Sequence, residues 1–216
     1  MNKGSLHKVI EVRELTDTVY VLRVERNGFE FQSGQYLALG KKGDIQKREY
    51  SIYSGEKDEY LEVLIKEVLE GDVSKKLHKL KVGDDVEIEG PYGHFILNGT
   101  PRDKKIIFIA SGTGISPCHS LIRSNPKLDY MVLHGVKYSF ESYDRHAYHP
   151  YRYIQCTSRE TEGDFYGRVT DYLSRHGADA KSEYFLCGNS NMIYDVFDIL
   201  KDKGVKQDQI HTEVYF

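Results

Sequence analysis

The chain has 216 residues, of which 39% are hydrophobic and 29% charged, and this composition excludes a wholly disordered protein. The formal net charge of −3 does not favour nucleic-acid binding. The mean hydropathy is −0.55, and the most obvious apolar run, residues 106–110, is far shorter than the roughly 20 residues that a bilayer-spanning helix needs. The first residues show no apolar run of signal-peptide length, and the three widely spaced cysteines give neither a disulfide framework nor a zinc site. We therefore expect a cytoplasmic globular protein of one or two domains.

The first hundred residues alternate short β-rich runs with clusters of Gly, Asp, Asn or Lys. The runs are 9–13, 18–24, 36–39, 48–53, 60–66 and 85–89. Strands this short and this closely spaced predict a small antiparallel barrel or sandwich over residues 1–99. One helix is expected at 74–80, with Ser74 as its N-cap and Leu77 and Leu80 on one face.

The pattern changes after residues 99–103, which we interpret as a linker to a second domain at 100–216. Strands are expected at 106–110, 130–133, 153–157, 184–187 and 210–215, and helices from about 115, at 142–149, at 169–176 and at 191–203. Apolar strands that alternate with helices predict a Rossmann-like α/β domain with a parallel sheet. Ligands of such sheets bind at the carboxyl ends of the strands, so the residues that follow each strand are candidate site residues.

A glycine-rich turn, S-G-T-G-I-S-P at residues 111–117, follows the apolar strand and opens a helix. Glycines let the backbone approach a ligand closely, and the first helical turn offers N–H groups and a positive dipole end. These properties suit a pyrophosphate. An ordinary turn between a strand and a helix is equally compatible with so short a pattern.

A second strand end carries Ser158 and Arg159, with Arg168 nine residues beyond. Arginine forms bidentate, charge-assisted hydrogen bonds to phosphate, so these residues suit a phosphate monoester. Taken alone, two arginines on a solvated surface are the commoner explanation.

A third strand ends in Cys187-Gly188. The cysteine fits a thiol nucleophile or an inert core residue, and a free cysteine is usually buried in the core. His146 and His149 stand three residues apart without further ligands nearby in the sequence, so we expect no metal site there.

In the first domain, Arg48 and Tyr50 lie two residues apart on one strand, and side chains alternate between the two faces of a strand, so these two share a face. A cation beside a flat aromatic ring suits a planar ligand with a phosphate tail, although an exposed strand with an Arg–Glu pair is common. The chain ends in Tyr215 and Phe216, and two aromatic residues in place of a polar terminus suggest a tail that packs onto something.

Six of these motifs occur in the same order in one family, and the sequence resembles the ferredoxin–NADP reductase family of two-domain flavoenzymes. The matching segments are Gly34-Gln35-Tyr36, Arg48-Glu49-Tyr50-Ser51, residues 61–66 with Gly71 to Ser74, residues 111–117, Cys187-Gly188 and Glu213-Val214-Tyr215. The resemblance covers almost the whole chain. It implies an antiparallel β-barrel that binds FAD, followed by a Rossmann-like domain that binds NADP(H).

The resemblance implies that Arg48 binds the FAD pyrophosphate, assisted by the helix start at Ser74. Tyr50 would stack on the isoalloxazine, and Ser51 would lie near flavin N5. Tyr215 would cover the opposite face of the flavin. The terminal Phe216 and the short segment 71–92 resemble bacterial members, in which the additional aromatic residue packs on the FAD adenine. The full set of implied FAD-binding residues is Arg48, Glu49, Tyr50, Ser51, Val63, Ile65, Lys66, Val73, Ser74, Thr113, Tyr215 and Phe216.

The resemblance also assigns the NADP(H) residues. The pyrophosphate would bind at the glycine turn, and Ser158, Arg159 and Arg168 would bind the 2′-phosphate and favour NADPH over NADH. The full set is Gly112, Gly114, Val136, Lys137, Ser158, Arg159, Arg168, Cys187 and Gly188. The residues expected to take part in hydride transfer are Ser51, Cys187, Glu213 and Tyr215.

The implied function is hydride transfer between NADP(H) and FAD, with single electrons exchanged between FAD and ferredoxin or flavodoxin. Four lysines near the expected flavin-side helix, Lys75, Lys76, Lys79 and Lys81, would steer an acidic partner or simply form a solvated face. Two alternatives stay open: an NAD(P)H-dependent flavin or cytochrome reductase, and a non-enzymatic flavin subunit of a larger complex. The electron acceptor, the direction of the reaction and the oligomeric state are not encoded in these motifs.

Overall fold

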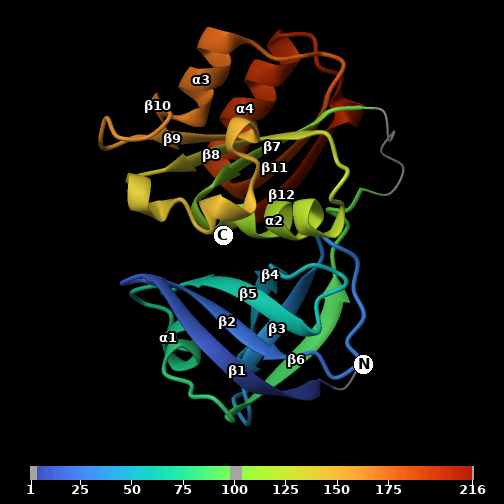
Figure 1. The fold of residues 1–216 in the computed structure, drawn as a ribbon, viewed down its shortest axis with the longest axis vertical. Coiled ribbons are helices and arrows are strands. Elements are labelled where there is room, and N and C mark those ends of the chain that lie inside the picture. The colour runs from blue at the N-terminus through green and yellow to red at the C-terminus, as the bar shows by residue number, and fades with distance from the viewer. Residues whose placement is uncertain (1–3, 98–103, 216) are drawn as a thin grey trace. The chain divides into compact units, whose positions relative to one another are not determined.

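The computed structural model describes residues 4–97 and 104–215, and the chain divides into two compact units (Figure 1). The first unit comprises Met1–Ile96 with His119–Ser124, and the second comprises Leu97–Cys118 with Asn125–Phe216. The expected linker at 99–103 and the boundary between residues 99 and 100 lie outside the described residues.

The first unit is built on an antiparallel six-stranded sheet in the order β4-β3-β6-β1-β2-β5. Its strands are β1 (Ser5–Thr16), β2 (Val19–Glu25), β3 (Tyr36–Lys41), β4 (Arg48–Ser51), β5 (Tyr60–Lys66) and β6 (Asp85–Tyr92). An isolated bridge between Ile52 and Val63 connects the two outer strands of this order, so the sheet curls back on itself. The predicted antiparallel fold of the first domain is thereby confirmed.

One short helix, α1 (Asp72–His78), covers this curled sheet and adds Val73 and Leu77 to its core (Figure 1). The expectation that Ser74 caps the helix is wrong, because the helix begins two residues earlier with Gly71 as its N-cap. The Ser74 hydroxyl instead accepts a hydrogen bond from the Val68 N–H at 3.1 Å and closes the preceding turn. The expected end at Leu80 is also two residues late.

His78 fixes the carboxyl end of α1 to two strands. Its Nδ1 lies 2.8 Å from a Glu67 carboxylate oxygen and its Nε2 lies 2.7 Å from one of Glu14. Its ring also stacks on Tyr20, with 4.2 Å between centroids. Burial acts to lower the pKa of His78, but the hydrogen bonds to Glu67 and Glu14 outweigh burial, and the pKa lies above its usual value.

Replacing His78 with Gln should destabilise the protein in a pH-dependent way. A histidine whose pKa is raised on folding stabilises the fold below its unfolded pKa of about 6.5, and this contribution is lost as the pH rises through the folded value. Thermal unfolding from pH 5 to 9 should show the wild type more stable by up to about 1 kcal/mol at the acidic end, with the difference shrinking at the alkaline end. His94→Gln, at an exposed histidine of the same unit, is the control and should show no such trend. A His78→Gln deficit that grows with pH would contradict the assignment.

The second unit contains a six-stranded parallel sheet in the order β10-β9-β8-β7-β11-β12. Its strands are β7 (Ile106–Ser111), β8 (Tyr130–Val136), β9 (Tyr153–Thr157), β10 (Phe165–Tyr166), β11 (Glu183–Asn189) and β12 (Ile210–Tyr215). Helices α3 (Val169–His176) and α4 (Ser190–Asp202) cover one face, and α2 (Ile115–Ser124) begins on the other (Figure 1). The predicted Rossmann-like α/β fold is confirmed, although the two-residue strand β10 carried no recognisable sequence signal.

The helix expected at 142–149 is absent. The segment forms short 3-10 turns instead, η2 (Ser139–Glu141), η3 (Arg145–Ala147) and η4 (Pro150–Arg152). Asp144 adopts a left-handed conformation with φ 48°, and Pro150 favours an extended conformation at His149. Both effects prevent a continuous helix.

None of the helices in residues 4–97 and 104–215 is long and apolar enough to cross a membrane.

Candidate functional site

The strand order of the second unit defines a switch point between β7 and β11. The chain proceeds outward from β7 through β8 and β9 on one side, and through β11 and β12 on the other. In open parallel sheets of this kind, ligands bind outside the carboxyl ends of the strands at this point. The glycine turn after β7, η1 (Gly112–Gly114), and the Cys187-Gly188 end of β11 therefore flank the expected binding position.

Two glycines allow these strand ends to approach each other. A Cβ atom on Gly114 would collide with the backbone of Cys187 and Gly188, and one on Gly188 would collide with Ser111. Gly188 also has φ +130°, a conformation that side chains disfavour. The Ser111 hydroxyl then accepts a hydrogen bond from the Asn189 N–H at 2.9 Å, which ties the two strand ends together. Close packing of backbone on backbone thus accounts for the Gly-x-Gly pattern.

Gly112 serves a different purpose. Its φ of +53° is a left-handed conformation, and the space where a side chain would project is open. The turn therefore presents bare backbone, as a phosphate-binding loop requires.

His134 is a member of this site that the sequence did not single out. It lies in β8, is fully buried, and its Nε2 is 2.8 Å from the carbonyl oxygen of Gly112. Its Nδ1 is 2.6 Å from the hydroxyl of Tyr153. Burial lowers the pKa of His134 to about 4, so the imidazole is neutral near pH 7. The sequence feature that could have identified His134 is its position as a polar residue within an otherwise apolar strand.

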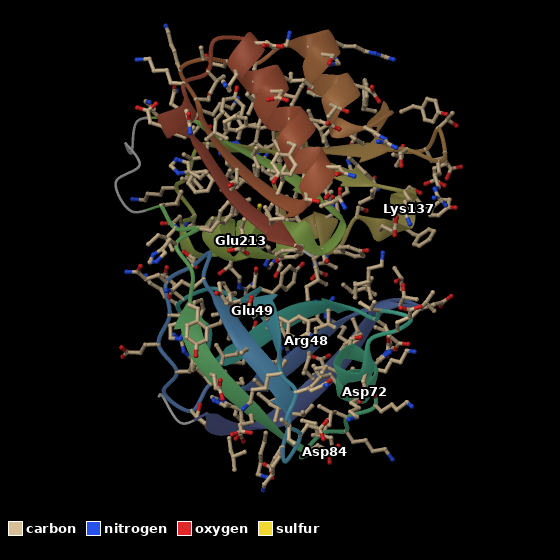
Figure 2. All side chains as sticks on the ribbon, turned by 180° about the vertical axis from the view of Figure 1, so that it is seen from behind. Arg48, Glu49, Asp72, Asp84, Lys137 and Glu213 are labelled. Carbon is tan, nitrogen blue, oxygen red and sulfur yellow. The ribbon has the colours of Figure 1, made fainter. Side chains whose placement is uncertain are left out.

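Cationic residues gather at the carboxyl ends of β8 and β9. Lys137, Arg159 and Arg168, here called the basic cluster, are all exposed, and Figure 2 marks Lys137. Two backbone hydrogen bonds bring their segments together: Arg159 N–H to the Lys137 carbonyl at 3.1 Å, and Gly167 N–H to the Thr157 carbonyl at 2.8 Å. Ser158 is exposed next to Arg159, and its hydroxyl donates to the Val136 carbonyl at 3.2 Å.

The acidic residues beside the basic cluster bind backbone N–H groups. A Glu141 carboxylate oxygen accepts from the N–H of Lys137 at 2.8 Å, and Asp171 accepts from the N–H of Arg168 at 2.7 Å. Glu160 accepts from the N–H of Ser139. Among the described residues, the structure gives no ion pair to the three side chains of the basic cluster. Their charges therefore remain available to an anion.

Cys187 and Glu213 lie side by side, because β11 and β12 pair them in register. Cys187 is fully buried, and burial, followed by the charge of Glu213 and the proximity of Cys118, raises the pKa of its thiol well above the usual value. A protonated, buried thiol does not act as a nucleophile near pH 7. Glu213 and Tyr215 are half-buried at the end of β12, and Figure 2 marks Glu213.

In the first unit, β4 brings together the residues expected to bind the flavin. Arg48 is exposed and Tyr50 is partly buried against the core, where burial raises its pKa to about 12 against the opposing charge of Arg48. The Arg48 guanidinium donates a hydrogen bond to the Lys47 carbonyl at 3.4 Å. Glu49 is exposed at the intervening position (Figure 2). Ser51 is buried where the strand ends. Arg48 has no acidic partner among the residues that the structure describes, and a cation of this kind beside a flat ring fits a dinucleotide cofactor such as FAD.

The other residues expected to bind FAD differ in burial. The side chains of Val63, Ile65 and Val73 belong to the core, so only their backbone groups could contact a ligand. Lys66 is exposed at the end of β5, and Ser74 is buried with its hydroxyl bonded to Val68. Thr113 is half-buried in the glycine turn of the second unit. Phe216 lies outside the described residues.

Comparison with known proteins agrees with this division. Residues 6–96 match the family model "Oxidoreductase FAD-binding domain". The chain is 28% identical to the flavodoxin/ferredoxin–NADP reductase of Buchnera aphidicola subsp. Schizaphis graminum, over 96% of this chain and 95% of that protein. It is 26% identical to the flavohemoprotein of Bacillus subtilis, over 86% of this chain and 52% of that protein, so it spans about half the length of this relative.

The fold matches over the whole chain. A ferredoxin NADP+ reductase from Neisseria gonorrhoeae superposes with a TM-score of 0.90 at 23% identity, covering 100% of both chains. The antiparallel unit, the parallel α/β unit and the order of the motifs agree with the resemblance to ferredoxin–NADP reductases. Residues 6–96 match an oxidoreductase FAD-binding domain, and the chain is similar over almost its whole length to ferredoxin–NADP reductases.

Proposed function

We propose that the protein is a flavoprotein reductase that transfers hydride between NADP(H) and FAD, and single electrons between FAD and a ferredoxin or flavodoxin. The observation that carries this proposal is the combination of an FAD-binding domain with a glycine turn at a sheet switch point, near basic side chains that form no ion pair within residues 4–97 and 104–215. FAD, when bound, accepts a hydride and passes its two electrons on one at a time, and the protein positions the reactants.

In the first unit, Arg48 binds the FAD pyrophosphate through charge-assisted hydrogen bonds. Tyr50 packs against the isoalloxazine, and Ser51 offers its hydroxyl near N5. Because Tyr50 already packs against the core, its ring is held in place before the cofactor binds. That rigidity lowers the ordering cost of binding.

In the second unit, the glycine turn binds the NADP(H) pyrophosphate, and Ser158 and the basic cluster bind the 2′-phosphate. Two arginines in place of an acidic residue favour NADPH over NADH. Cys187 and Glu213 orient the nicotinamide. Tyr215 covers the flavin face that the nicotinamide approaches.

Cys187→Ala should slow hydride transfer far more than it reduces FAD content. The substitution removes a buried sulfur at the nicotinamide position, and a small displacement of reacting groups costs on the order of 100-fold in rate. Stopped-flow reduction of the flavin by NADPH measures this rate. FAD content should stay nearly constant, because Arg48, Tyr50 and Ser51, which are proposed to bind the pyrophosphate and the isoalloxazine, lie in the first unit.

Cys156→Ala is the matched control for this prediction. Cys156 is another fully buried cysteine of the same sheet, in β9, and it belongs to the core. Its substitution should leave the reduction rate within about 2-fold of the wild type, since its side chain packs in the core of the second unit and not at the strand end where Cys187 lies. An unchanged rate in Cys187→Ala, or equal slowing in both variants, would refute the role given to Cys187.

Ferredoxin or flavodoxin as electron carrier is supported by the name of the Buchnera relative. A cytoplasmic location is supported by three free, buried cysteines. Steady-state oxidation of NADPH with ferredoxin, flavodoxin, cytochrome c and free FMN as separate acceptors tests the carrier. The proposal predicts the highest kcat/KM with ferredoxin or flavodoxin. A preference for free flavin or cytochrome, or no NADPH oxidation with any acceptor, would overturn it.

A further inference from the structure

The hydrogen bonds of His134 determine which nitrogen carries its proton. A carbonyl oxygen only accepts, so the nitrogen facing Gly112 must donate, and the neutral ring is the Nε2–H tautomer. Nδ1 then accepts from the Tyr153 hydroxyl. Burial raises the pKa of Tyr153, so its hydroxyl stays protonated and remains a donor. The pair thus has one consistent arrangement of protons.

The Gly112 carbonyl also accepts the Ile115 N–H, so both of its lone pairs are used. The carbonyl of Gly112 and the N–H of Thr113 belong to one planar trans peptide and point in opposite directions. Glycine at positive φ permits this peptide to rotate with little steric resistance. A bond that holds the carbonyl towards His134 therefore directs the Thr113 N–H to the other side, away from the sheet.

We propose that His134 is a positioning residue for the dinucleotide: it fixes the Gly112–Thr113 peptide in the orientation that offers the Thr113 N–H to a pyrophosphate oxygen. This inference rests on the proposed function, in which the glycine turn binds NADP(H). His134 touches neither substrate nor cofactor, and it acts through the peptide.

Tyr153 acts one step further away. Without its hydroxyl, Nδ1 loses its hydrogen-bond donor, and the preference for the Nε2–H tautomer weakens. In the Nδ1–H tautomer, the bare Nε2 would face the Gly112 oxygen lone pair to lone pair. The Tyr153 ring is held by stacking on Tyr148, with 5.0 Å between centroids, and by the Arg145 guanidinium 5.3 Å above it. The rigid packing of Tyr153 fixes the tautomer of His134.

The test compares His134→Leu, His134→Gln and Tyr153→Phe in the FAD-loaded protein. Leu removes the donor at similar volume, whereas the Gln side-chain amide extends to a similar distance and restores it. The dissociation constant of NADP+, measured by calorimetry, should rise about 10-fold in His134→Leu and stay within about 3-fold in His134→Gln, as expected for losing or keeping one hydrogen bond. Tyr153→Phe should fall between them. At saturating NADPH, kcat should stay within about 2-fold of the wild type in all three variants. The bound substrate and the transition state lose the same binding free energy, so the barrier between them is unchanged.

Two further measurements separate positioning from general damage. Tyr184→Phe removes another buried hydroxyl bond in the same sheet, 3.0 Å from the Asp179 carbonyl, and should leave NADP+ affinity unchanged. Nitrogen-15 NMR of labelled histidine should show the Nε2–H tautomer in the wild type and a mixture in Tyr153→Phe.

Each outcome decides a different claim. Wild-type affinity in His134→Leu, or equal weakening by Leu and Gln, overturns the inference alone. An Nδ1–H tautomer in the wild type overturns it whether or not NADP+ binds. A wild-type protein that binds FAD but no NADP+ overturns the proposed function, and the inference falls with it.

Discussion

Replacing Arg159 and Arg168 together with alanine should abolish the preference for NADPH over NADH. Each arginine that forms a charge-assisted hydrogen bond to the 2′-phosphate contributes about 1.5–3 kcal/mol, so losing both should lower kcat/KM for NADPH by at least about 100-fold. NADH has no 2′-phosphate, so its kcat/KM should change by no more than about 2-fold. Steady-state kinetics with both nucleotides and a fixed acceptor give the ratio directly.

The control for this prediction removes two positive charges elsewhere in the second unit. Arg175 lies in the last turn of α3, and Lys181 precedes β11 at the opposite end of the sheet. Arg175→Ala with Lys181→Ala should leave the nucleotide preference intact. An unaltered preference in the Arg159/Arg168 variant, or an equal loss in the control, would show that the basic cluster does not bind the 2′-phosphate.

Gly114→Ala should cost both stability and turnover. The added methyl would occupy the space of the Cys187 carbonyl and the Gly188 Cα, and backbone atoms cannot move aside as a flexible side chain does. Overpacking of this kind costs about 1–3 kcal/mol, and displacement of the turn should lower NADPH-dependent turnover on the order of 100-fold. Thermal unfolding and flavin reduction kinetics measure the two effects.

Gly135→Ala is the matched control, since Gly135 also lies near the carboxyl end of a strand in this sheet. Its added Cβ would meet a Val169 methyl at 3.2 Å, and a side-chain methyl can shift. The expected destabilisation is below about 1 kcal/mol. If Gly114→Ala turned over NADPH as fast as Gly135→Ala, the close approach of the two strand ends would not matter for function.

Much of the fold could be predicted because its signals are local. The bounds of the strands predicted at 60–66, 153–157 and 210–215, and of the helix predicted at 169–176, coincide with those of the observed elements. The Gly-x-Gly turn could be placed because an apolar strand precedes it and a helix follows. Its steric reason, contact with the Cys187 backbone 73 residues away in the sequence, is visible only in the folded chain.

The remaining features depend on tertiary contacts that the sequence does not display. Glu141 bonds to the backbone N–H groups of Lys137 and Tyr138 instead of the Lys137 ammonium, and this arrangement has no signature in a single sequence. The role of His134 depends on Tyr153 in the neighbouring strand. Ser74 was misplaced as a cap because serine closes turns as readily as it begins helices.

The most direct test of the proposed function is anaerobic titration of the purified, FAD-reconstituted protein with NADPH, followed through the visible absorption of the oxidised flavin. We expect stoichiometric FAD and loss of its absorption band with about one equivalent of NADPH, because one hydride carries the two electrons that the flavin accepts. A protein that retains no flavin after reconstitution, or a bound flavin whose absorption NADPH leaves unchanged, would contradict it.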